Sequence, residues 1–154
     1  MLKKKIGYLF FILFLFITVF IFVNSIRDAA QSSSQSHVVV KVTKAIIKTV
    51  KPDKEIDNDI LTHFVRKLAH YTEFFFQSAA LGGFIYCITK RFNVIYILFS
   101  GLFTACCDEL IQLFSDGRSA QVSDIFIDFS GCVTAALIYS SIYFLVRIKV
   151  KERG

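Results

Sequence analysis

The sequence lacks the short motifs by which many enzymes and binding proteins are recognised. It contains no G-x-S-x-G, H-E-x-x-H or Walker-type motif, so it supports no known hydrolase and no ATP-driven mechanism. Its 4 cysteines form no C-x-x-C motif and lie inside apolar runs, where cysteine usually acts as a small buried hydrophobe. No basic patch is interleaved with aromatic residues, so we expect no nucleic-acid partner.

Charge is also scarce. Charged residues make up 19% of the 154 residues, whereas 55% are hydrophobic and 18 are phenylalanine. A soluble domain of this length rarely carries so much apolar surface, so the composition predicts a single-domain, multi-pass protein of the cell membrane. Basic residues gather in the short segments 1–5, 90–91 and 147–154. The positive-inside rule therefore predicts that both termini are cytoplasmic.

Four apolar runs predict four membrane spans. Ile6–Val23 carries no charge and is long enough to cross the bilayer. A secretory signal peptide is the alternative, but the run is long for one and no A-x-A cleavage site follows. The other runs are Leu68–Thr89, Phe92–Phe114 and Val122–Val146. Their short connections require antiparallel neighbours, so we predict an all-α integral membrane four-helix bundle.

The first loop has a pattern of its own. Val39, Val42, Ile46 and Val50 recur at helical spacing, which predicts a short amphipathic helix on the membrane surface. A strand over residues 38–42 is the alternative. Asp57 or Asn58 is expected to cap the helix that follows. The predicted organisation is a first transmembrane helix (1–23), an outer loop (24–65), a three-helix core (66–146) and a basic cytoplasmic tail (147–154).

The last three spans carry ionisable and amide residues near one end, which the predicted topology places on the outer side. A charge at bilayer depth costs about 2.5–3.5 kcal/mol even on the lenient insertion scale, so such residues are expected to have a function. The candidate catalytic residues are His70, Glu73, Asp108, Glu109, Asp124 and Asp128. The candidate substrate-binding residues are Arg66, Lys67, Gln112 and Arg118.

Helical spacing arranges many of these residues in three stripes. The stripes are Arg66, His70, Glu73 and Gln77; Thr104, Ala105, Asp108 and Gln112; and Asp124, Asp128, Gly131 and Ala135. Small residues four positions apart let two helix backbones approach closely. The sequence has two such pairs, Gly131 with Ala135 and Ala79 with Gly83. We therefore predict that the stripes converge on a polar pocket open to the outside.

Several roles remain open within this pocket. Asp108 and Glu109 point about 100° apart on a helix, so one should line the pocket while the other pairs with a basic residue. The like-charged Asp124 and Asp128 need a compensating group, which could be Arg118, a bound proton, a divalent metal ion or a cationic ligand. Arg118 could instead recognise a phosphate or carboxylate.

Simpler roles compete with the functional ones on the second span. His70 with Glu73 could act as an acid–base or ligand pair, or form only a helix-end ion pair. Arg66 and Lys67 could bind an anionic headgroup, or only reach toward lipid phosphates.

Three strings of the sequence resemble the VanZ-like family of bacterial membrane proteins. They are RKLAHYTEF at 66–74, DELIQLFSDGR at 108–118, and Asp124 and Asp128 followed by Gly131. The resemblance covers roughly residues 55–146. The sequence departs from the family pattern at Asp116, where proline is common, at Asp128, where asparagine is common, and at Phe74, which replaces tyrosine.

The resemblance implies a link to low-level teicoplanin resistance, the property associated with the family's namesake. Together with the topology, it suggests an outward-facing pocket that acts on or recognises a membrane lipid, an envelope precursor or another lipid-linked molecule. Whether the protein is an enzyme stays open. The alternatives are a non-catalytic binding or regulatory protein and a small proton- or cation-coupled transporter, which with so few helices would need to form a homo-oligomer.

Overall fold

The computed structural model describes residues 2–27, 40–41 and 57–151, and within those ranges the chain is helical with no strand. The long helices are α1 (Leu2–Ile26), α3 (Asn58–Thr89), α4 (Val94–Gln112) and α5 (Val122–Lys151). The all-α bundle predicted from the sequence is therefore confirmed. The predicted amphipathic helix, and its strand alternative, lie outside the described residues except at Val40 and Lys41, which are helical.

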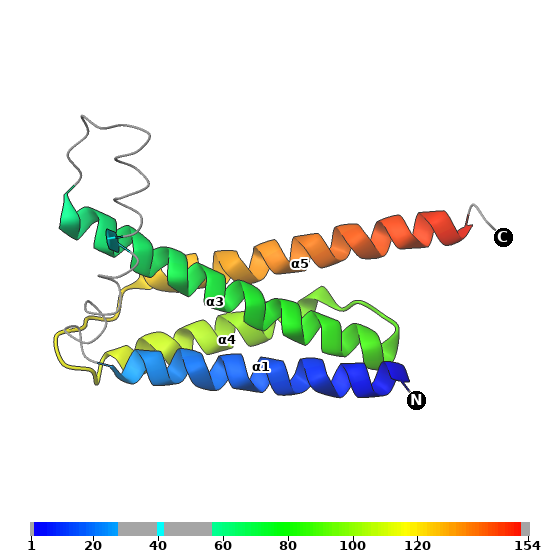
Figure 1. Ribbon diagram of the computed structural model, residues 1–154, viewed down its shortest axis with the longest axis horizontal. Helices are drawn as coiled ribbons and strands as arrows, with labels where there is room; N and C mark the ends of the chain where they lie inside the picture. Colours follow the sequence, from blue (N-terminus) through cyan, green and yellow to red (C-terminus); the bar gives the residue numbers. More distant parts are fainter. Residues whose placement is uncertain (1, 28–39, 42–56, 152–154) are drawn as a thin grey trace.

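The helices alternate in direction along the chain (Figure 1). One end of the bundle holds the start of α1, the α3–α4 connection and the end of α5. The other end holds the end of α1, the start of α3 and the connection between α4 and α5. Helix α3 packs extensively against both α1 and α5, and α4 contacts α5 and α1. Helix α1 is thus part of the same packed unit as the later helices.

Local sequence signals mark the ends of these helices. Asp57 caps α3, where its side chain accepts a hydrogen bond of 2.9 Å from the backbone N–H of Asp59. Asn93 caps α4 by accepting from the N–H of Ile95 at 3.1 Å. Gly117 has a φ of 72°, which is the left-handed conformation that the predicted turn after α4 requires.

Among the residues that the structure describes, three helical segments are long and apolar enough to cross a membrane: α1, α4 and residues 122–149 of α5. The sequence predicted four spans, and the helix that falls short of this hydropathy is α3. Helix α3 has 32 residues and is long enough. Its mean hydropathy is lower because polar residues such as Glu73 and Gln77 interrupt the apolar run, and its first turns are charged. The side chains of Glu73 and Gln77 bond to other helices, as described below.

A small residue, Gly131, lies where α5 packs against the backbone of α3. A Cβ atom added to Gly131 of α5 would lie 2.3 Å from the carbonyl oxygen of Tyr71 in α3. Ala135, one turn further along α5, is also buried. The predicted close approach of backbones at Gly131 is therefore present. Nearby, Ile21, Phe74, Ala105 and Cys132 form a buried apolar cluster.

Candidate functional site

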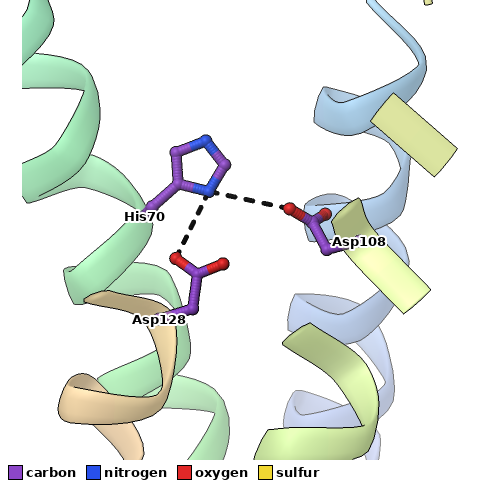
Figure 2. A group of neighbouring side chains, drawn as sticks. All are labelled: His70, Asp108 and Asp128. Carbon is purple, nitrogen blue, oxygen red and sulfur yellow. Dashed lines mark ion pairs between the residues drawn. The ribbon is translucent and has the colours of Figure 1, made fainter. Parts of the chain in front are cut away.

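Three of the predicted residues meet in one place, and we call them the His–Asp–Asp centre: His70 of α3, Asp108 of α4 and Asp128 of α5 (Figure 2). The Nδ1 atom of His70 lies 3.8 Å from Oδ2 of Asp108 and 3.6 Å from Oδ1 of Asp128. One potential ligand atom from each residue lies within 4.8 Å of the other two. Three separate helices therefore supply one compact polar group.

The centre is shielded from solvent. The side chains of Asp108 and Asp128 are 0% exposed, and that of His70 is 22% exposed. Buried polar groups are normally satisfied by hydrogen bonds. Among the described residues, however, Nδ1 of His70 and both carboxylate oxygens of Asp128 have no hydrogen-bond partner. The centre therefore has bonding capacity that the neighbouring protein groups leave unused.

Asp108 is the best-supported member of the centre. It accepts hydrogen bonds from the hydroxyl of Ser25 in α1 and from Nε2 of Gln112, the latter at 2.8 Å. The backbone carbonyl of Ser25 in turn accepts from the hydroxyl of Ser115 at 2.7 Å. Gln112, predicted to bind substrate, thus serves here to orient a carboxylate.

The predicted stripe on α3 faces the interior, but its members contact different partners. Glu73 accepts a hydrogen bond of 3.2 Å from the side chain of Asn24 in α1. One turn further, Gln77 donates to the hydroxyls of Thr18 at 2.8 Å and Thr104 at 3.2 Å. His70 alone of these residues contacts the two buried aspartates. Glu73 and Gln77 therefore connect α3 to α1 about one and two helical turns after His70.

Glu109 points away from its neighbour Asp108. Its Oε2 atom accepts a hydrogen bond of 2.8 Å from the backbone N–H of Gln121, in the connection before α5. Adjacent helical residues diverge by about 100°, so the two carboxylates have different partners. The hydrogen bond to Glu109 comes from a backbone N–H, however, where the sequence predicted a basic side chain. Glu109 is buried but lies outside the His–Asp–Asp centre.

The basic residues lie around the centre. Lys67 pairs with Asp124 at 3.0 Å, and both side chains are 27% exposed. Asp124 and Asp128, predicted as a like-charged pair, therefore have different surroundings. Asp124 belongs to a partly exposed ion pair, and Asp128 is buried. Arg118 is close enough to His70 and Asp108 to act on both electrostatically, and Arg66 acts on His70.

Helix α1, from which no site residue was predicted, contributes Asn24 and Ser25 to the surroundings of the centre. A signal was present. Thr18, Ile21 and Ser25 have the spacing of one helical face, and Thr18 lies within the apolar run while Ser25 follows it directly after Asn24. Hydroxyl groups at membrane depth usually bond across helices.

An apolar groove lies between α1 and α3 beside the centre. It has a volume of about 730 Å³, and Glu73 is the ionisable residue in its lining. Phe16, Phe64, Leu68 and Phe76 are each more than half exposed, so the groove lies on the surface of the bundle. The lining residues are Leu13, Phe16, Ile17, Phe20, Phe64, Val65, Leu68, Ala69, Thr72, Glu73 and Phe76.

The fold and the centre together define a helical membrane protein with a buried polar site at one end of its bundle. The VanZ/LLP1 family model matches residues 10–146, so the chain belongs to the VanZ/LLP1 family. The match includes most of α1 as well as the three motifs noted in the sequence. No curated protein and no solved structure matches this chain.

Proposed function

We propose that this VanZ/LLP1 family protein recognises an amphiphilic molecule of the cell envelope, such as a lipid-linked precursor. Its polar head would lie near the His–Asp–Asp centre and its hydrocarbon chain in the α1–α3 groove. One observation carries the proposal: the buried polar centre and the apolar groove adjoin each other on α3. Glu73 lines the groove and lies one helical turn from His70. A mostly apolar lining with few polar groups is typical of ligand sites.

We also propose that all four helices cross the membrane with both termini cytoplasmic. Segments 1–5 and 90–91 and the end of α5 are basic and lie at one end of the bundle (Figure 1). Basic short segments stay preferentially on the cytoplasmic side. The packing of α3 against both α1 and α5 supports its crossing with them. In this orientation the centre lies in the outer half of the membrane, within reach of envelope molecules.

The chemistry of the site suits binding of a polar head and also permits proton transfer to it. His70 beside two carboxylates could exchange a proton with a bound group. Arg118, within electrostatic reach of the centre, suits a phosphate or carboxylate on the ligand. We propose that teicoplanin resistance, the property implied by the family resemblance, would arise through such a ligand.

The groove can be tested by filling it. Ala69→Trp places a large side chain in the groove, and Ile138→Trp on the exposed face of α5 is the matched control. Full-length protein would be purified in mild detergent and its bound lipids identified by mass spectrometry. We expect the wild-type and Ile138→Trp proteins to retain an amphiphile that Ala69→Trp loses. Equal lipid content in all three proteins would contradict the proposal.

The centre can be tested in cells. His70→Ala, Asp108→Asn and Glu109→Gln would be expressed at equal levels in a teicoplanin-susceptible bacterium and compared with the wild type. We expect protection by the wild type that is lost with the first two variants, because both residues belong to the centre. If all three variants insert normally and keep full protection, the centre has no part in the function.

A further inference from the structure

We infer that the His–Asp–Asp centre binds a divalent metal cation of the zinc or manganese type. The inference concerns the free protein and does not depend on the amphiphile proposed above.

The donor atoms are close enough to share one ion. They are an imidazole nitrogen and two carboxylate oxygens, one from each of three helices (Figure 2). Zinc bonds to such atoms of about 2.0–2.2 Å place two tetrahedral ligands roughly 3.4 Å apart. The separations from His70 to Asp128 and Asp108 are 3.6 and 3.8 Å. Small side-chain movements would therefore close the group around an ion.

The second observation is the state of Asp128. Its side chain is 0% exposed, its Oδ1 is directed at His70, and neither of its oxygens has a hydrogen-bond partner among the described residues. Nδ1 of His70 is likewise unsatisfied. A buried carboxylate without compensation is unfavourable, and buried charges are usually paired or bound to metals. An ion placed between these atoms would satisfy both residues at once.

Asp108 has the surroundings of an oriented metal ligand. Ser25 and Gln112 donate hydrogen bonds to its carboxylate. Such outer partners fix ligating side chains in metal sites and are needed for full affinity. A neutral imidazole with two ionised carboxylates carries two negative charges, which a divalent cation balances. Arg118 and Arg66 are competing positive groups near the centre.

The donor set also selects among metals. Imidazole favours zinc and related transition metals, whereas carboxylates also accept manganese, and no thiolate belongs to the group. Calcium and magnesium prefer sites made of oxygen atoms alone. With three protein ligands, a coordination position would remain for an oxygen atom of water or of a bound head group.

The test measures metal directly. Full-length protein in mild detergent would be stripped with a chelator, incubated with Zn²⁺ or Mn²⁺, desalted and assayed by elemental analysis. We expect a stoichiometric amount of metal on the wild type and on Glu109→Gln, the matched control whose carboxylate lies outside the centre. Asp128→Asn and His70→Ala should lose it. Ser25→Ala should weaken Zn²⁺ binding about 10–100-fold, because it removes an outer partner of Asp108.

A second measurement guards against misfolded variants. The absorption spectrum of added Co²⁺ reports its ligands, and each variant must elute as a single species on size exclusion before it is compared. A cobalt spectrum that changes in Asp128→Asn but not in Glu109→Gln supports the site. Metal content that is absent from the wild type, or equal in the wild type and Asp128→Asn, overturns it. The counterion of Asp128 would then belong to the protein, with His70, 3.6 Å from its Oδ1, the candidate.

Discussion

The contact at Gly131 gives the sharpest prediction about how the site is held. In Gly131→Ala, the new Cβ atom would lie 2.3 Å from the carbonyl oxygen of Tyr71 and 3.0 Å from the backbone nitrogen of Phe75. Both atoms belong to the α3 backbone, so no change of rotamer relieves the overlap. An ordinary carbon–oxygen contact is about 3.3 Å, so α3 and α5 must separate by roughly 1 Å.

The magnitude follows from two opposed effects. Overpacking a well-packed contact typically costs about 1–3 kcal/mol, and a backbone overlap belongs in the upper part of that range. Replacing glycine by alanine in a helix returns up to about 1 kcal/mol. We therefore expect a net loss of roughly 1–2 kcal/mol. Asp128 lies one turn before Gly131 on α5, so the same shift would widen its 3.6 Å separation from His70.

The assay is thermal unfolding of the purified protein in mild detergent, followed by circular dichroism and by loss of the monodisperse peak. Ser130→Ala is the matched control, because Ser130 is adjacent in sequence and exposed. We expect Gly131→Ala to unfold at a clearly lower temperature and Ser130→Ala to behave like the wild type. Unfolding of Gly131→Ala at or above the wild-type temperature would show that α3 and α5 do not approach this closely.

Three further predictions use the same unfolding assay. Ser25→Ala should lower the stability of the folded protein by about 1–3 kcal/mol, because it removes a buried hydrogen bond to Asp108. An unchanged stability would mean that α1 does not support the centre. Gly101→Ala should destabilise the protein, because the new Cβ would lie 2.4 Å from the sulfur of Cys132. The double variant Gly101→Ala/Cys132→Gly should regain stability. A double variant no more stable than Gly101→Ala would contradict the contact. Lys67→Met should change the stability by less than about 1 kcal/mol, because the ion pair between Lys67 and Asp124 is partly exposed. A larger loss would show that this ion pair is buried.

Local patterns allowed much of the fold to be predicted. Long apolar runs separated by short polar connections predicted the helices, and the cap at Asp57 and the turn at Gly117 follow from single residues. The spacing of polar residues placed His70, Asp108 and Asp128 on inward faces. These signals are local, so each could be recognised without knowing what the helix packs against.

The remaining features depend on contacts between distant parts of the chain. Ser25 bonds to Asp108 across 83 positions of sequence, and no periodicity within one helix specifies that partner. Sequence patterns place no residue of α1 in the site, because the overall hydropathy of this helix hides its few polar residues. Averaged hydropathy also explains why three helices, and not the predicted four, are apolar enough to span a membrane. Polar residues of α3 that bond to other helices lower the mean hydropathy of that helix.

The most direct test of the central claim measures whether α3 and α5 bring His70 and Asp128 together in the membrane. Cysteines would replace these two residues in a protein whose native cysteines are changed to alanine, with a protease site in the turn at Gly117. We predict that Hg²⁺ bridges the new thiols, so that the fragments remain joined after cleavage, whereas a His70→Cys/Ser130→Cys control separates. Separation of the first pair, or equal joining of both, would contradict a shared His–Asp–Asp centre.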